Sequence, residues 1–277
     1  MEAFASNPQM DGGGLMKPPA VMALSGGMDS TCLLLRLLRE GHAVTALGFD
    51  YGQRHRRELD MAQHNVTALQ KQGQAVTYNV VDLRSAMASL ESSLTNHDAD
   101  MPEGHYAEDQ MKQTVVPNRN AIFSSLLFAT ALSLSKDHQG AARIALGVHS
   151  GDHAIYPDCR PEFYTALEHA FKIGNWDAEH VNFDLPYLHL DKAGTLSDGL
   201  ASCDVLGLDF DTVLASTLTS YAPDEDGRSL GTTGADVERI LAFHDIGRVD
   251  PIAYVAPWDV VLSNALDLRS AHEEGNA

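Results

Sequence analysis

The stretch that decides the fold is Val21-Met22-Ala23-Leu24-Ser25-Gly26-Gly27-Met28-Asp29-Ser30, an apolar run that ends in a Ser-Gly-Gly-x-Asp-Ser turn. Four consecutive apolar residues are typical of a parallel strand that is buried on both faces. Gly26 and Gly27 permit positive φ angles and the close approach of an anion, and Asp29 and Ser30 can cap a following helix. We therefore expect a strand-to-helix turn whose backbone N–H groups bind a polyphosphate. The Lys-Ser/Thr pair of a Walker A loop is absent, and the six residues alone are also compatible with an ordinary glycine-rich turn.

Helical and strand patterns alternate after this turn. Apolar residues at helical spacing over 31–39 precede Gly41 and an apolar run over 43–49, which together predict a right-handed βαβ unit. By the same patterns we expect further strands over 75–81, 143–148 and 181–188, and helices that end near Lys71 or span 120–134, 161–173, 191–203 and 236–244. A weaker strand pattern covers 216–221, polar stretches over 85–113 and 222–234 predict loops, and the chain after Pro257 has no clear pattern.

The predicted class is α/β, with an open parallel sheet of about five strands, helices on both faces and a small irregular C-terminal part. We expect a disordered lead-in at 1–19, a nucleotide-binding domain at 20–200 and a C-terminal segment at 201–277 that packs on the same domain. Open parallel sheets bind ligands at the carboxyl edge of their strands. Functional side chains are therefore expected in the residues that directly follow the strands.

The composition restricts the class of partner. With 38 acidic and 19 basic residues the chain has a formal charge of −19, which repels a phosphate backbone and disfavours extensive contact with DNA or RNA. Its three cysteines are too few and too scattered for a disulfide framework. No segment reaches the ~18 apolar residues of a membrane span, and the first residues lack the apolar core of a signal peptide. We therefore expect a cytoplasmic protein that acts on a small molecule or a protein, without nucleic-acid or membrane contact.

Four motifs in the same order resemble those of the 7-cyano-7-deazaguanine synthase (QueC) family. They are Ser25-Gly26-Gly27-Met28-Asp29-Ser30, Phe49-Asp50-Tyr51-Gly52-Gln53-Arg54-His55, Val116-Pro117-x-Arg119-Asn120 and Tyr156-Pro157-Asp158-Cys159-Arg160-Pro161-Glu162-Phe163. Matches at Asp191-Lys192-Ala193 and Gly247-x-x-Asp250-Pro251-Ile252 extend the resemblance over residues 20–255. It implies a pyrophosphatase-loop ATPase with an adenine nucleotide alpha hydrolase-like fold. It also implies the ATP-dependent conversion of 7-carboxy-7-deazaguanine with ammonia, first to an amide and then to a nitrile, in the queuosine pathway.

The resemblance further implies roles for single residues. ATP and Mg²⁺ would be bound by the loop and the motif that follows it, at Ser25, Gly26, Gly27, Asp29, Ser30, Tyr51, Gln53 and Arg54. Catalysis would depend on Asp29, Ser30, Arg119 and Lys192. Of these, Arg119 and Lys192 are cations, which stabilise the charge that builds up on phosphate. The deazaguanine substrate would contact Asn120, Tyr156, Asp158 and Arg160, where a carboxylate suits the N–H edge of the ring and a guanidinium suits the substrate carboxylate. Taken singly, each residue is equally compatible with a turn or a solvated surface.

The metal-ligand patterns of the chain are weak. His149 and His153 have the spacing of a helical metal pair, but Ser-Gly-Asp between them favours a loop, so we expect ordinary polar loop histidines. The family binds zinc through four cysteines, and the matching positions here are Ser220, Leu230, Thr233 and Asp236. Because a leucine cannot bind zinc, we expect no zinc in this protein.

Replacement of the zinc ligands leaves the amine acceptor open. Ammonia would lead to the amide and then to the nitrile, whereas a larger amine, such as a protein N-terminus, would stop at a secondary amide. We favour the nitrile synthase, with an amide-forming ligase as the alternative. A non-catalytic nucleotide-binding scaffold is a third interpretation, disfavoured because four cations at the sheet edge are retained together: Arg54, Arg119, Arg160 and Lys192. A homodimer is the expected assembly.

Overall fold

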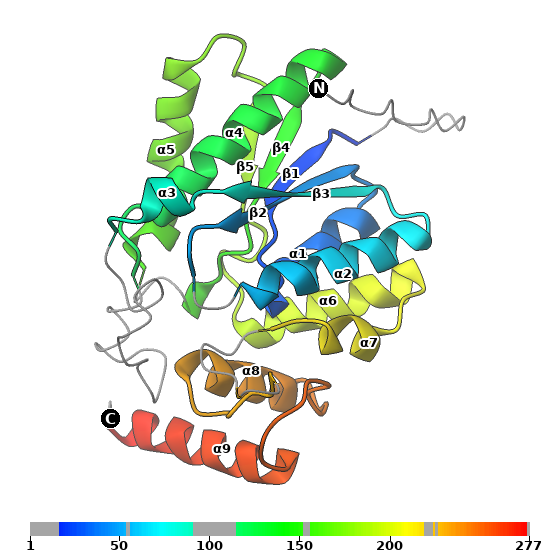
Figure 1. Cartoon of the computed structure of the whole chain (residues 1–277), viewed down its shortest axis with the longest axis vertical. Coiled ribbons are helices and arrows are strands. Elements are labelled where there is room, and N and C mark those ends of the chain that lie inside the picture. The colour runs from blue at the N-terminus through cyan, green and yellow to red at the C-terminus, as the bar shows by residue number, and fades with distance from the viewer. Residues whose placement is uncertain are drawn as a thin grey trace.

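The computed structural model describes residues 17–53, 56–90, 115–151, 156–218, 224 and 227–275. Its centre is a five-stranded sheet in the order β3-β2-β1-β4-β5, and every neighbouring pair is parallel. The strands are β1 (Ala20–Ala23), β2 (Val44–Asp50), β3 (Val76–Asp82), β4 (Ala142–Ala145) and β5 (Val181–Asp184). The chain runs outward from β1 to β3 and then returns to the other side of β1 (Figure 1). Ligands of open parallel sheets bind at such a switch point.

Two helical layers cover the sheet because successive residues of a strand point to opposite faces. Met22 of β1 belongs to one apolar core and its neighbour Val21 to the other. The core around Met22 is completed by α1 (Met28–Arg39), α2 (Arg57–Lys71), α6 (Lys192–Leu206) and α7 (Phe210–Ala215). The core around Val21 is completed by α4 (Arg119–His138) and α5 (Pro161–Gly174), and the two layers flank the sheet in Figure 1.

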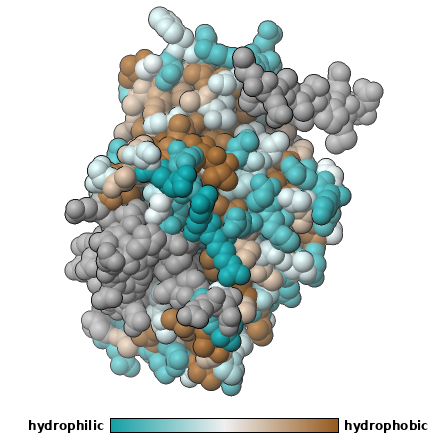
Figure 2. Space-filling model, in the orientation of Figure 1, coloured by the Kyte–Doolittle hydropathy of each residue, from teal (hydrophilic) through white to brown (hydrophobic). Residues whose placement is uncertain are grey.

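The C-terminal part adds two helices beyond these layers. Helices α8 (Gly234–Asp245) and α9 (Trp258–Gly275) share a small apolar core of their own and lie below α6 in Figure 1. Two short elements complete the described chain, α3 (Arg84–Met87) and the 3-10 helix η3 (Pro157–Cys159). On the face shown in Figure 2, hydrophobic and hydrophilic residues are interspersed. None of the described helices is long and apolar enough to span a membrane.

The α/β class and the five parallel strands confirm the sequence prediction. The strand predicted over 216–221 is wrong over 216–218, where the N–H groups of Ser216 and Thr217 close turns at the end of α7, and Leu218 N donates to Gly26 O at 3.1 Å. The strand predicted over 181–188 ends at Asp184, and the unplaced tail forms α9. Several predictions fall outside the described residues: 1–16 of the lead-in, 91–113 and most of 222–226 of the two loops, and 219–221.

Candidate active site

The Ser-Gly-Gly-x-Asp-Ser turn joins β1 to α1 as predicted. Gly26 has a φ of +92°, and a Cβ atom at this position would overlap the carbonyl oxygen of Glu58 in the first turn of α2, so only glycine fits. Gly27 N donates to Ser25 Oγ at 3.2 Å, and Ser30 Oγ donates to Gly27 O at 3.2 Å. Helix α1 begins without a side-chain cap, so the expectation that Asp29 or Ser30 caps it is wrong, and its N-terminus is left for an anion.

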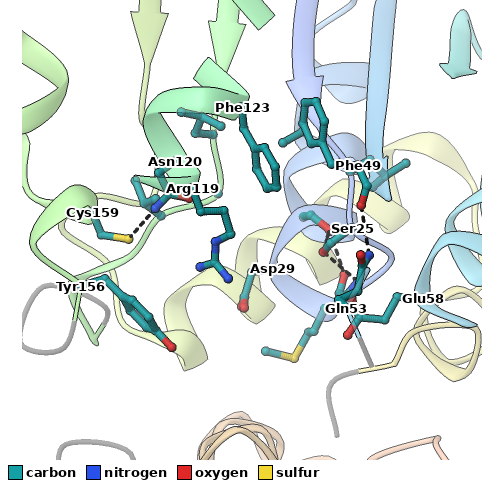
Figure 3. A pocket seen from close by; sticks show the side chains of 18 of the residues that line it. Ser25, Asp29, Phe49, Gln53, Glu58, Arg119, Asn120, Phe123, Tyr156 and Cys159 are labelled. Carbon is teal, nitrogen blue, oxygen red and sulfur yellow. Dashed lines mark hydrogen bonds between the residues drawn. The ribbon is translucent and has the colours of Figure 1, made fainter. Parts of the chain in front are cut away.

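A cavity of about 310 Å³ opens beside this turn at the carboxyl edge of the sheet. Most predicted site residues line it: Ser25, Gly27, Asp29, Ser30, Tyr51, Gln53, Arg119, Asn120, Tyr156 and Lys192. In the close view, the loop and β2 supply one wall and the start of α4 supplies the other (Figure 3). The structure thus brings the predicted phosphate loop and the predicted substrate residues to the same space.

The wall opposite the loop is organised by Arg119 at the start of α4. The preceding Asn118 has a φ of +59°, a left-handed conformation that asparagine tolerates better than most residues. The Arg119 guanidinium lies 5.8 Å from the centre of the Tyr156 ring and hydrogen-bonds to Tyr51. Burial raises the pKa of Tyr51, while the nearby guanidinium acts in the opposite direction. Tyr51 is therefore a neutral hydroxyl held against a cation at neutral pH.

The substrate residues predicted near η3 separate into two groups. Asn120 N donates to Asp158 Oδ2 at 3.3 Å, and the Asn120 side-chain amide donates to the backbone oxygen of Asp158 at 3.4 Å. The other carboxylate oxygen of Asp158 is buried and has no hydrogen-bond partner among the described residues, but Asp158 is not one of the residues that line the cavity. Arg160, at the start of α5, does not line the cavity, and Arg54 is outside the described residues.

Lys192 enters the cavity from the start of α6 and joins a cluster of charged groups. Its Nζ lies 2.7 Å from Glu238 Oε2 and 3.5 Å from Asp29 Oδ2. The second oxygen of Asp29 is buried and has no hydrogen-bond partner in the described part of the chain. A carboxylate with an unsatisfied oxygen at the end of a phosphate loop fits Mg²⁺, which prefers oxygen ligands and keeps several waters.

The expectation of an ordinary polar loop histidine is wrong for His149. The residue does lie in a loop, but its side chain is buried, with Nε2 placed 3.4 Å from Lys192 Nζ and 4.0 Å from Asp29 Oδ2. Nδ1 accepts from Gly151 N at 3.1 Å, so Nε2 carries the proton when the ring is neutral and faces the Asp29 carboxylate. His153 lies outside the described residues.

Sequence reasoning missed three acidic or aromatic parts of the site. Glu58 lines the cavity, and burial raises the pKa of its carboxyl group to about 8, opposed by Arg119. Phe123 of α4 stacks on Phe49 with ring centres 4.1 Å apart. Glu58 could have been predicted as a site residue, because it lies in the first helical turn after the second motif. Glu238 had none, because it reaches Lys192 only through the packing of α8 on α6.

The positions matched to zinc ligands do not fit a metal. Thr233 and Asp236 form a capping box at the start of α8, with Thr233 Oγ1 donating to Asp236 Oδ2 at 2.7 Å. Leu230 is partly exposed, and Ser220 is outside the described residues. Across the described ranges, no group of three or more His, Cys, Asp or Glu side chains is arranged to hold a metal.

Comparison with known proteins agrees with the four motifs. The family model described as "Queuosine biosynthesis protein QueC" matches residues 19–247. This chain belongs to the QueC family. Among its QueC relatives, the 7-cyano-7-deazaguanine synthase of Methanoregula boonei is 42% identical over 85% of this chain and 98% of that protein. The corresponding synthase of Alteromonas mediterranea is 43% identical over 86% of this chain and 100% of that protein.

Solved structures offer weaker similarity to this QueC family member. The NMN synthetase of Francisella tularensis overlaps with a TM-score of 0.36 and 14% sequence identity, covering 91% of this chain and 86% of that one. An overlap this low says nothing about function, so the family membership rests on the sequence relatives.

Proposed function

We propose that this protein is an ATP-dependent 7-cyano-7-deazaguanine synthase. The carboxylate of 7-carboxy-7-deazaguanine attacks the α-phosphorus of ATP, which releases pyrophosphate and gives an acyl adenylate. Ammonia then displaces AMP, and the amide forms with loss of a proton. A second ATP adenylates the amide oxygen with release of pyrophosphate. Loss of AMP and protons from the nitrogen leaves the nitrile.

The observation that carries this proposal is the shared cavity. A carboxylate is a poor electrophile until its oxygen becomes part of a good leaving group, so carboxylate and nucleotide must meet at one place. The cavity joins the loop at Ser25–Ser30 to Arg119, Asn120 and Tyr156, which come from the other half of the sheet. The names of the relatives, 7-cyano-7-deazaguanine synthase, support the same product.

The proposed role of each residue follows from its charge. The backbone of the loop would bind the pyrophosphate of ATP, and Asp29 would hold Mg²⁺ through the oxygen that has no partner among the described residues. Mg²⁺ when bound neutralises phosphate charge. Arg119 and Lys192 place two cations at the cavity wall, where they stabilise the charge that develops during transfer of the adenylyl group. Asp158 accepts a hydrogen bond from the cavity-lining Asn120, and its other carboxylate oxygen, which is buried, is suited to the N–H edge of the deazaguanine ring.

The test is an incubation of the purified protein with 7-carboxy-7-deazaguanine, Mg²⁺, ATP and ammonium, followed by mass spectrometry of the products and measurement of pyrophosphate. The nitrile, with two pyrophosphates per nitrile formed, is the expected result. ATP consumption that stalls at the adenylate and resumes only with a larger amine would replace the nitrile synthase by an amide-forming ligase. If the protein binds ATP but releases no pyrophosphate when substrate is added, the result would favour the third interpretation, a non-catalytic nucleotide-binding scaffold.

A further inference from the structure

The contact between Glu238 and Lys192 links the C-terminal part of the chain to the cavity. Glu238 belongs to α8, whereas Lys192 begins α6 on the main domain. Their 2.7 Å ion pair is mostly shielded from water, with 20% of the Glu238 side chain and 11% of the Lys192 side chain exposed. An ion pair in this setting is stronger than one on the surface, because solvent screens it less.

The start of α8, which contains two of the positions matched to zinc ligands, is fixed by hydrogen bonds. Asp236 is fully buried and accepts from the Ser229 hydroxyl at 2.7 Å, from the Thr233 hydroxyl at 2.7 Å and from Thr233 N at 3.2 Å. Ser229 Oγ accepts in turn from Gly231 N at 3.1 Å. Both carboxylate oxygens of Asp236 are thus satisfied without a metal, and this cluster of Ser229, Thr233 and Asp236, the cap cluster, sets where the helix begins.

A second contact fixes the rotation of α8. Arg239, the residue after Glu238, is fully buried and donates to both carboxylate oxygens of Asp250, at 2.6 and 2.9 Å. It also donates to Thr217 Oγ1 at 2.8 Å. With its start and its rotation both set, the helix can present Glu238 to Lys192 in one position only.

We propose that Glu238 is a positioning residue, held by the metal-free cap cluster at the start of α8, that fixes the Lys192 ammonium beside the phosphate loop. The inference rests on the proposed function for the catalytic role of Lys192. Without the Glu238 charge, the nearest carboxylate left to Lys192 in the described part of the chain is Asp29, now 3.5 Å away. Lys192 would then move onto Asp29 and compete with Mg²⁺ for it. Glu238 therefore holds the lysine 3.5 Å from the metal-binding carboxylate and prevents a closer contact.

The kinetic experiment compares Glu238→Gln with Asp245→Asn in ATP–pyrophosphate exchange driven by 7-carboxy-7-deazaguanine. Asp245 is a matched control because it is an acidic residue at the other end of α8, paired with Arg269 of α9 at 3.1 Å. We expect Glu238→Gln to lower the exchange rate about 10- to 100-fold and to raise the Mg²⁺ concentration required for half-maximal rate, as a misplaced catalytic group does. Asp245→Asn should keep the exchange rate of wild type, and both variants should remain folded, with a single cooperative melting transition. An exchange rate and Mg²⁺ requirement unchanged in Glu238→Gln would overturn the inference.

A second readout does not depend on catalysis. The wild type and the two variants are treated with an N-hydroxysuccinimide acetate, and acetylation of Lys192 is followed over time by peptide mass spectrometry. An ammonium held between two carboxylates reacts slowly, and Glu238→Gln leaves Lys192 with Asp29 alone, so Lys192 should be acetylated several-fold faster in this variant than in wild type or Asp245→Asn. Equal rates in all three proteins would overturn the inference. If wild type shows no exchange, the proposed function fails, and the acetylation rates still decide the role of Glu238.

Discussion

Two helix starts in this protein are built in opposite ways. At α1 the N-cap is Gly27, which has no side chain to cap the helix, and the loop faces the cavity. At α8 the N-cap is Thr233, and a complete capping box with Asp236 occupies the N–H groups that would otherwise be free. An open helix start can bind an anion, whereas a closed one serves as a structural joint. Changes at the first should therefore affect catalysis, and changes at the second should affect stability.

The largest effect is expected for Arg239→Ala in α8, the helix with the closed start, which we call the closed end. Removing the guanidinium leaves the Asp250 carboxylate buried without its ion-pair partner, which costs about 3–5 kcal/mol. Urea unfolding of the variant and the wild type measures this difference. The control is Arg269→Ala, which breaks a partly exposed pair with Asp245 and should cost about 0–1 kcal/mol. Similar losses of unfolding free energy in the two variants would show that the buried pair contributes no more to stability than the exposed one.

Gly26→Ala tests the loop at the uncapped start of α1, which we call the open end. The φ of +92° and the carbonyl oxygen of Glu58 leave no room for a methyl group, so the loop must shift, and we expect pyrophosphate exchange to fall about 10²-fold or more. Gly73→Ala is the matched control, since Gly73 also has a positive φ but a Cβ there would meet nothing within 4 Å. If both variants keep wild-type exchange, the tight fit of the loop does not matter for activity.

Asp236→Asn should have a smaller effect, on stability. The amide cannot accept from all three of its donors as the carboxylate does, and loss of a hydrogen bond to a charged group costs about 1.5–3 kcal/mol. Treatment of the wild type with 1,10-phenanthroline should leave its melting temperature unchanged, because the cap cluster needs no metal. A chelator-dependent drop in melting temperature, or stoichiometric zinc by elemental analysis, would contradict this account of the closed end.

The last effect depends on pH and concerns Glu58, which lies against the open loop. Its pKa is raised by burial from 4.5 to about 8, so the folded chain keeps this proton at a pH where the unfolded chain has lost it. The contribution of the site to folding stability is therefore fully present below pH 4.5 and is lost as the pH rises toward 8. Glu58→Gln cannot titrate, so its melting temperature should gain on that of wild type between pH 5 and pH 8. A difference that is constant with pH would refute the raised pKa.

The sequence predicted the open end far better than the closed one. The loop at Ser25–Ser30 is local, since the strand, the glycines and the first helical residues are contiguous, and the positive φ of Gly26 follows from its glycine. The burial of His149 and the reach of Glu238 depend on how α6 and α8 pack, which no local pattern encodes. Helix α7 spans only Phe210–Ala215, too short for a clear period, and the alternating Thr217-Leu218-Thr219 that follows it imitated a strand.

The order of the strands also governs when the protein becomes active during its synthesis. Val21 of β1 pairs with Thr45 of β2 on one side but must wait for Ile144 of β4 on the other. A ribosome adds about 5–20 residues per second, so the phosphate loop emerges many seconds before its opposite wall, and Glu238 of α8 emerges later still. We expect a nascent chain that ends before α8 to contain the phosphate loop and Lys192 but to lack Glu238, which positions the lysine. Before α8 has folded onto α6, such a chain would therefore use ATP more slowly than the folded protein, because Lys192 has not yet gained its contact with Glu238.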